Sequence, residues 1–229
     1  MRKPLNAIVG FTEILDNRYF GDLTERQAEY VECILQASTH LMALIDDILD
    51  LATIEAGYMT LDLQDVEITS LMGALAEVAA ERADQAGLKI KIDCPADIGT
   101  MSGDIVRLRQ ALFNLVSNAI QFTPAGGTIV LSAERTKNDM LLSVSDSGVG
   151  ISPEDQERVF QRFERGDPNA RESGAGLGLA LVKSLVELHG GSVELESAPG
   201  QGTNATCRIP LHSPELENET PTLGTESVN

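Results

Sequence analysis

The spacing of apolar residues predicts two helices at the start of the chain. Between residues 5 and 15 the apolar side chains fall three or four positions apart, as they do on one face of a helix. A polar stretch around Gly21 then interrupts the pattern. Thr24 and Gln27 form a T-x-x-Q capping box, which predicts that a second helix begins there and continues to Glu55.

An apolar seam runs along the second predicted helix. Two interleaved series of residues repeat every seven positions: Ile34, Leu41 and Ile48, and Tyr30, Ala37, Leu44 and Leu51. Two helices alone bury too little apolar surface to be stable, so we expect the hairpin of residues 1–57 to form a homodimer, a four-helix bundle made with a second copy. The alternative is that the hairpin packs on the rest of its own chain.

From residue 58 onward the pattern changes to short alternating strands and amphipathic helices. Strands are predicted at 60–66, 89–94, 127–135, 140–146, 192–197 and 203–210, and helices at 70–86, 104–122, 153–163 and 178–189. This order predicts an α+β fold, in which an α/β sandwich with a mixed sheet follows the helical hairpin. By range, we expect a linker or first strand over 58–65, a compact domain over 66–211 and an acidic disordered tail over 212–229.

The chain is strongly acidic, and this excludes some classes of binding partner. Among 229 residues, 35 Asp and Glu stand against 17 Lys and Arg, which gives a formal net charge of -18. Nucleic-acid binding needs clustered Lys and Arg, and an anionic membrane surface would repel such a chain. We therefore expect no nucleic-acid partner and no membrane contact in this segment.

The cysteines indicate a reducing compartment. They are three in number, widely spaced, and form no CxxC pair: Cys33, Cys94 and Cys207. Neither a disulfide framework nor a structural zinc site is expected from such a pattern. We expect a cytoplasmic location, in which any tether to the inner membrane belongs to a region upstream of Met1.

Three segments carry candidate chemistry, and the first is a pair of asparagines. Asn114 and Asn118 are four positions apart on a predicted helix and so share one face. Their carboxamide oxygens are suitable ligands for a hard cation such as Mg²⁺. The alternative is that both side chains only hydrogen-bond a neighbouring loop.

The second segment follows an apolar strand and reads Asp146-Ser-Gly148-Val-Gly150. The two glycines allow the backbone to approach a flat ligand closely, and the carboxylate can accept a hydrogen bond from an exocyclic amine. An ordinary turn between two strands is the alternative.

The third segment is glycine-rich and opens the last predicted helix. It reads Gly174-Ala-Gly176-Leu177-Gly178, and unpaired N–H groups at such a helix start favour phosphate. No strand immediately precedes it, as a Rossmann fingerprint would require. It also lacks the Gly-Lys-Ser/Thr of a P-loop.

In combination the three segments resemble a known family. The intervals from Asn118 to Asp146 and from Asp146 to Gly174 are each 28 residues, and Phe160 and Phe163 lie in the second interval. This order resembles the N box, first G box, F box and second G box of the ATP-binding domain shared by sensor histidine kinases, DNA gyrase, a class of heat-shock chaperones and MutL (the GHKL, or Bergerat, type).

The start of the chain resembles the kinase branch of that family. Residues 2–11 are similar to the stretch that follows the phosphoacceptor in the kinases' dimerisation domain. Residues 10–22 and 54–63 are similar to alphaproteobacterial cell-cycle kinases. The resemblance covers residues 1–211.

The resemblance implies ATP and Mg²⁺ as cofactors. It implies that Asp146 recognises the adenine amine and that Asn118, with Asn114, holds Mg²⁺. By the same analogy, residues 164–175 form a lid over the phosphates. The remaining implied nucleotide-site residues shape the pocket, anchor the lid or close on the phosphates: Gly148, Gly150, Phe160, Phe163, Arg165, Gly174, Gly176, Leu177 and Gly178.

The sequence also departs from the kinase pattern. The implied acceptor falls two residues before Met1, and Lys3 replaces the Thr or Ser that helps kinases to dephosphorylate their partner, so we expect no phosphatase activity of the usual kind. Gln121 stands where a basic residue commonly approaches the phosphates. We therefore expect weak nucleotide binding, or reliance on Arg165 or Arg171.

Two functions follow from these features. The first is the catalytic core of a two-component histidine kinase, which passes the γ-phosphoryl group of ATP to the upstream acceptor and signals to a response regulator. The second is an atypical kinase or pseudokinase scaffold, with an acceptor other than histidine, that binds a receiver domain without conventional phosphotransfer. An ATP-hydrolysing clamp is disfavoured, because Asn114 cannot act as a general base. In either case, receiver docking is expected on the hairpin at Ile8, Phe11, Thr12, Leu15, Gln27, Tyr30, Val31 and Ile34.

Overall fold

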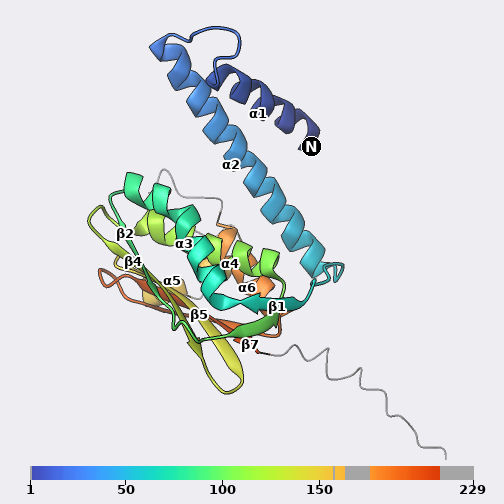
Figure 1. The fold of residues 1–229 in the computed structure, drawn as a ribbon, viewed down its shortest axis with the longest axis vertical. Helices are drawn as coiled ribbons and strands as arrows, with labels where there is room; N and C mark the ends of the chain where they lie inside the picture. Colours follow the sequence, from blue (N-terminus) through green and yellow to red (C-terminus); the bar gives the residue numbers. More distant parts are fainter. Residues whose placement is uncertain (1, 157, 163–175, 212–229) are drawn as a thin grey trace, which may run out of the picture. The chain divides into compact units, whose positions relative to one another are not determined.

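The computed structural model describes residues 2–156, 158–162 and 176–211, and Figure 1 shows the ribbon. The chain divides into two compact units, Met1–Ala56 and Gly57–Asn229. The predicted tail over 212–229 and the whole of the predicted lid over 164–175 lie outside the described residues. Within the described residues, no helix is long and apolar enough to cross a membrane.

The first unit is a helical hairpin of α1 (Arg2–Asp16) and α2 (Glu25–Glu55) (Figure 1). The predicted capping box is confirmed at the start of α2. The Thr24 hydroxyl accepts a hydrogen bond from the Gln27 backbone N–H at 3.4 Å, and the Gln27 side chain accepts one from the Thr24 N–H at 2.9 Å. These two bonds satisfy N–H groups that the first turn of a helix leaves unpaired.

The hairpin leaves much of its apolar surface uncovered. Its first half buries a short row of side chains: Leu5, Val9, Thr12, Val31 and Ser38. The exposed apolar residues include three members of the predicted heptad seam, Ile34, Leu41 and Ile48, each 46–47% exposed in this single chain. A row of exposed apolar side chains on a long helix is typical of an interface between helices.

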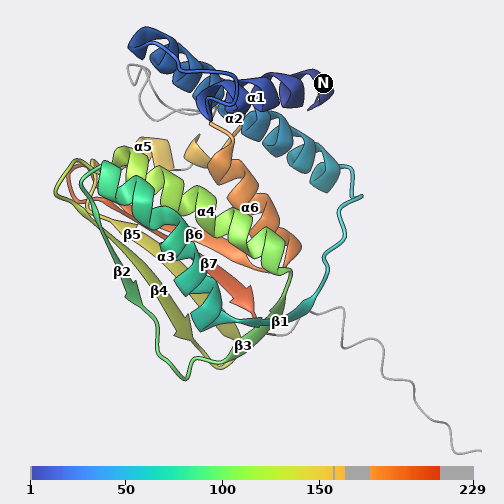
Figure 2. The ribbon, with the colours of Figure 1, turned by 45° about the horizontal axis from the view of Figure 1, so that its top comes forward.

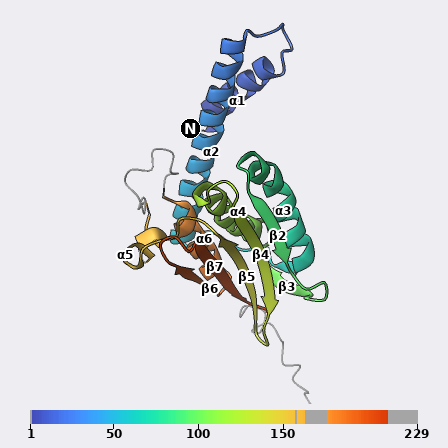
Figure 3. The same cartoon turned by 90° about the vertical axis from the view of Figure 1, so that its left-hand side faces the viewer.

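The second unit is built on a five-stranded mixed sheet with the order β2-β4-β5-β7-β6 (Figure 3). In that order the strands are β2 (Lys89–Asp93), β4 (Thr128–Arg135), β5 (Asp139–Asp146), β7 (Thr203–Pro210) and β6 (Ser192–Ser197). β2 and β4 are parallel, and the other neighbours are antiparallel. A separate antiparallel pair joins β1 (Gln64–Glu67) to β3 (Thr100–Gly103).

Three helices cover one face of this sheet: α3 (Ile68–Gln85), α4 (Ile105–Phe122) and α6 (Gly178–Leu188) (Figure 2). Alternate residues of β4 and β5 are buried beneath them, because successive side chains of a strand point to opposite faces. The fully buried side chains of this core come from both layers and include Met72, Leu108, Leu112, Ile129, Leu131, Met140, Leu142, Leu181 and Leu185. The predicted α+β sandwich is therefore confirmed.

Three local predictions differ from the structure. The strand expected from residue 60 begins only at Gln64, because its partner β3 offers four positions for pairing. β3 itself was not predicted. The helix expected over 153–163 is wrong: α5 (Pro153–Gln156) is one turn, and a separate 3-10 turn, η1, spans Arg158–Phe160. The Gln156 side chain instead donates to the Ser197 carbonyl oxygen at 2.6 Å, which ties this segment to the end of β6.

Candidate nucleotide site

The two asparagines lie on the side of α4 that meets the start of α6. A Cβ atom added at Gly178 would lie 3.9 Å from the Cβ and Cγ atoms of Asn114 and 3.9 Å from Nδ2 of Asn118. Among the described residues, Nδ2 of Asn114 is buried and has no hydrogen-bond partner. A buried polar atom without a partner is costly, and its cost is removed when a polar ligand or water binds it.

Asp146 ends β5, half-buried, and begins a tight loop. Its carboxylate accepts hydrogen bonds from the backbone N–H of Gly148, at 2.8 Å, and of Thr203. Burial raises the pKa of Asp146, and these two hydrogen bonds partly oppose that rise. The carboxylate is therefore held by the loop at Gly148 and by the start of β7 at Thr203, while the half-exposed side chain still meets solvent.

The Asp146 loop is attached to the last turn of α4. The Val149 N–H donates to the Phe122 carbonyl oxygen at 3.2 Å, and a Cβ atom at Gly148 would lie 2.5 Å from that same oxygen. Only glycine fits at position 148 without moving one of the two segments. The alternative interpretation as an ordinary turn explains the glycines but not this attachment to the asparagine helix.

Gly150 and Gly202 allow a second close approach on the other side of the loop. Both have positive φ angles, 69° and 79°, which favour glycine. A Cβ atom at Gly150 would overlap the Ala198 carbonyl oxygen, and one at Gly202 would overlap the Asp146 carbonyl oxygen. Gly202 and Thr203 belong to none of the three predicted segments, and the Gly200-x-Gly202-Thr203 pattern at the start of β7 is the sequence signal that marks them.

The third predicted segment is described from Gly176 onward. Gly176 has a φ of 69°, Leu177 is buried, and α6 begins at Gly178 with no side chain capping its first turn. Uncapped N–H groups at a helix start are donors that suit an anionic group. Phe163, Arg165, Arg171 and Gly174 lie outside the described residues.

Two further predicted residues have clear positions. Phe160 is half-buried in η1, which packs against α6. Gln121 is exposed, on the turn of α4 that follows Asn118. The Asp146 loop meets α4 at Phe122, which lies four residues after Asn118 and eight after Asn114. At about 1.5 Å per residue, these separations along the helix are about 6 Å and about 12 Å. That separation suits a ligand with a base at one end and phosphates at the other.

The donor set fits a hard cation held by amide oxygens. Within the described residues, no cluster of three or more His, Cys, Asp or Glu side chains is placed to hold a metal ion. The Asn114 and Asn118 carboxamides, with a phosphate ligand nearby, match the preference of Mg²⁺ for a few protein oxygens and retained waters.

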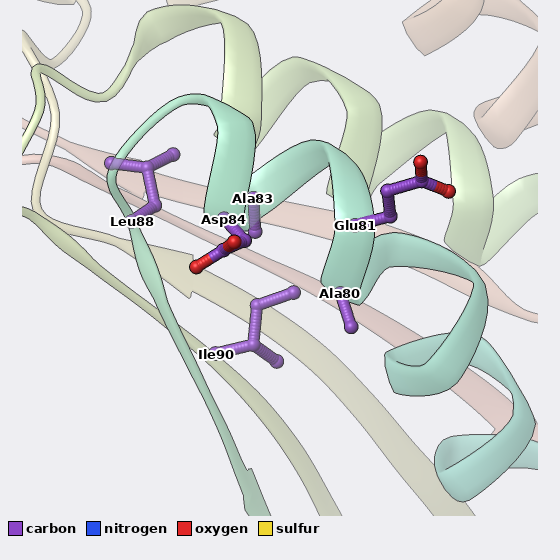
Figure 4. Close-up of a pocket in the computed structure, with 6 residues that line it drawn as sticks. All are labelled: Ala80, Glu81, Ala83, Asp84, Leu88 and Ile90. Carbon is purple, nitrogen blue, oxygen red and sulfur yellow. The ribbon is translucent and has the colours of Figure 1, made fainter.

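A separate cavity of about 470 Å³ lies between α3 and β2 (Figure 4). Its wall consists of Ala80, Glu81, Ala83, Asp84, Leu88 and Ile90. In Figure 4 the Glu81 carboxylate points away from Leu88 and Ile90. None of the three candidate segments contributes to this cavity, which is therefore distinct from the site around α4.

The predicted docking residues are divided between surface and interior. Ile8, Phe11, Leu15, Gln27, Tyr30 and Ile34 are exposed on the hairpin. Thr12 and Val31 are buried, and the Thr12 hydroxyl donates to the Ile8 carbonyl oxygen at 2.7 Å. The exposed members alone can therefore present a surface in this hairpin.

Comparison with known proteins identifies the class. Residues 1–57 match the His Kinase A (phospho-acceptor) domain, and residues 103–213 match the histidine kinase-, DNA gyrase B- and HSP90-like ATPase domain. The chain belongs to the histidine kinase family and is a catalytic core with an ATP-binding domain. The resemblance to sensor histidine kinases of the cell-cycle type is thereby confirmed.

Individual relatives agree with this assignment. The sensor protein DivL of Caulobacter vibrioides is 42% identical, and the match covers 92% of this chain and 26% of DivL. The histidine protein kinase DivJ of the same organism is 39% identical, with 97% of this chain and 37% of DivJ covered. The crystal structure of full-length ShkA with AMPPNP matches with a TM-score of 0.78 and 34% identity, covering 93% of this chain and 44% of ShkA. The chain thus spans about a quarter to under a half of these relatives.

Proposed function

We propose that this chain binds Mg-ATP around α4 and transfers the γ-phosphoryl group to an acceptor residue two positions before Met1. The observation that carries the proposal is the convergence of the three segments on α4. Asn114 and Asn118 lie on it, Gly178 at the start of α6 faces that pair, and the Phe122 carbonyl oxygen binds the Asp146 loop. Segments 28 residues apart in sequence therefore approach the same helix, which supports a shared ligand.

Each part of the site has a proposed role. The Asp146 carboxylate accepts a hydrogen bond from the adenine amine, and Gly148 and Gly150 keep the backbone close enough for a flat base. The uncapped N–H groups at the start of α6 donate to phosphate oxygens. Asn118 with Asn114 holds Mg²⁺, which would neutralise charge on the phosphates when bound.

The asparagine at position 114 favours transfer of the γ-phosphoryl group to a side chain over hydrolysis of ATP. A water molecule that attacks phosphate needs a general base, and a carboxamide does not accept a proton at neutral pH. The site therefore orients ATP but does not activate water through Asn114. A side chain delivered from the hairpin is the expected acceptor, and the exposed heptad seam supports a homodimer that delivers it.

The test uses the chain extended upstream by its natural residues and incubated with γ-labelled ATP. We expect label on the protein, and Asp146→Asn should lose both label and nucleotide binding, because an amide that donates toward the adenine amine replaces an acceptor. Asp139→Asn at the opposite end of β5 is the matched control and should retain both. Unchanged nucleotide affinity in Asp146→Asn would contradict the proposed site.

A second candidate function is supported by Lys3 and Gln121. A lysine ammonium has no acceptor with which to orient water, and an exposed amide at position 121 adds no positive charge near the phosphates. Both features suit an atypical kinase or pseudokinase scaffold that binds a receiver domain on the exposed hairpin residues. A protein that binds a receiver domain but takes up no label, with a residue other than histidine two positions before Met1, would favour this function.

Both candidates place the chain in the cytoplasm, where ATP is available. The three cysteines are unpaired in the structure, which suits a reducing compartment.

A further inference from the structure

One buried carboxylate, that of Asp104, connects the linker after the hairpin to the asparagine helix. Its Oδ1 atom caps α4 by accepting from the N–H groups of Val106, at 3.0 Å, and Arg107, at 3.2 Å. Its Oδ2 atom accepts from the Asp62 backbone N–H at 3.1 Å, across 42 residues of sequence. Among the described residues, this is the one hydrogen bond that residues 57–63 make to the rest of their unit.

The backbone of Asp104 is bonded in turn to His189, which ends α6 and is 4% exposed. Nε2 of His189 lies 3.1 Å from the Asp104 nitrogen, and Nδ1 lies 2.7 Å from the Leu185 carbonyl oxygen. A backbone N–H only donates and a carbonyl oxygen only accepts. His189 is therefore the neutral tautomer that carries its proton on Nδ1 and accepts at Nε2.

These bonds hold α4 and α6 together at the end opposite to the candidate nucleotide site. The start of α4 meets the end of α6 at Asp104 and His189, while the middle of α4 meets the start of α6 at Asn114 and Gly178. The two helices are thus antiparallel and joined at two points. At about 1.5 Å per residue, Asn114 lies about 15 Å from Asp104 along α4. A shift of α6 along α4 at the first point is transmitted to the second, because both helices are rigid and packed.

We propose that Asp104 and His189 are positioning residues that couple the linker to the nucleotide site. When the linker holds its bond to Asp104, α6 keeps the register that places Gly178 against Asn114. When the hairpin draws the linker away, Asp104 loses one of its partners and α6 is freed to shift. The inference rests on the proposed ATP binding and adds a route by which the hairpin regulates it.

The packing around this point explains why a small displacement is transmitted. A Cβ atom at Gly103 would lie 2.8 Å from Cδ1 of Leu108 and 3.6 Å from Cδ2 of His189. Because these side chains are closely packed, Asp104 or His189 cannot move without displacing its neighbours. An N-cap alone would need only one carboxylate oxygen, whereas here the second oxygen binds the linker.

The central variant is Asp104→Asn in the full chain. Asparagine is as good an N-cap as aspartate, so α4 remains capped through its single side-chain oxygen, but the amide nitrogen cannot accept from Asp62. Asp65→Asn on β1 removes the same charge from an exposed side chain and serves as the control. We expect Asp104→Asn to speed amide hydrogen exchange in α6 and to weaken binding of a fluorescent ATP analogue about 3- to 10-fold, with Asp65→Asn unchanged.

A linker insertion distinguishes coupling from simple destabilisation. Two glycines inserted after Tyr58 should change exchange in α6 and nucleotide affinity in the wild-type chain, but should add nothing in Asp104→Asn, because the linker bond is already lost. His189→Gln, whose side-chain oxygen can accept from the Asp104 N–H, should restore most of the affinity that His189→Leu loses.

The outcomes separate the two proposals. Equal exchange in wild type and Asp104→Asn, or additive effects of the insertion and this substitution, overturns the coupling. A wild-type chain that binds no nucleotide overturns the proposed function, while exchange in α6, measured without nucleotide, still decides whether the linker and α6 are coupled.

Discussion

Replacing Gly148 by alanine tests the attachment of the Asp146 loop to α4. The new Cβ atom would lie 2.5 Å from the Phe122 carbonyl oxygen and 2.7 Å from Oδ1 of Asp146. Real carbon–oxygen contacts are longer than 3.0 Å, so either the loop or the end of α4 must move. The first neighbour is backbone, and the second is a carboxylate oxygen that the Gly148 N–H already binds at 2.8 Å, so neither turns aside at little cost.

The magnitude follows from the contacts that such a movement breaks. Relief of overpacking costs about 1–3 kcal/mol. The loop also loses the bond from Gly148 to Asp146 and the bond from Val149 to Phe122, each worth about 1 kcal/mol. We therefore expect the free energy of unfolding to fall by about 3–5 kcal/mol. Nucleotide affinity should fall at least about tenfold, since tenfold corresponds to only about 1.4 kcal/mol.

Gly73→Ala is the matched control. Gly73 lies within α3 with nothing within 4 Å of an added Cβ atom, so alanine there should raise stability by about 0.5–1 kcal/mol through its helix propensity. The chain has no tryptophan, so urea unfolding is best followed by far-UV circular dichroism. Nucleotide affinity is measured with a fluorescent ATP analogue.

The refuting result is specific. If Gly148→Ala unfolds at the same urea concentration as wild type and binds nucleotide with the same affinity, the close approach of the loop to Phe122 does not exist in solution. A variant that loses stability but keeps nucleotide affinity would retain the packing argument and refute the role of this loop in the site.

Two other predictions follow from Gln121 and His189. Gln121→Lys restores a cation beside the phosphates and should tighten ATP-analogue binding roughly 5- to 150-fold, or about 1–3 kcal/mol, as measured by titration at low salt; unchanged affinity would show that position 121 does not approach the phosphates. Burial lowers the pKa of His189 below its usual 6.5, against the Leu185 hydrogen bond and the Asp104 charge, which raise it. The unfolded chain therefore gains this proton first, so His189 should lower the free energy of unfolding as pH falls below 6.5 and leave it unaffected above that pH. His189→Gln should lose this part of the pH dependence in urea titrations; an unaltered profile would contradict the assignment.

Local chemistry allowed much of this protein to be predicted from its sequence. The capping box of Thr24 and Gln27 depends on residues three positions apart, and the pattern of α2 repeats along one helix, so both were visible before any fold was known. The asparagine pair and the glycine motifs are likewise short patterns in a fixed order. They indicated the histidine kinase family and the α+β sandwich, both of which are confirmed.

Contacts between distant residues could not be predicted in this way. Sequence patterns predicted a helix through residue 163, but the bond from Gln156 to Ser197, 41 residues away, holds α5 to one turn. β3 was invisible because a four-residue strand becomes recognisable only through its partner. The role of Phe122 is carried by its backbone carbonyl oxygen, which no side-chain pattern reveals.

The sequence by itself determined most of the helices and strands and the chemical groups they carry, because helix caps, strand alternation and glycine turns depend on neighbours along the chain. Only the tertiary structure decided that Asp104 joins the linker to α4 and that His189, 85 residues further on, accepts from its backbone. Those bonds depend on the register in which packed helices and strands meet. That register is set by the core as a whole.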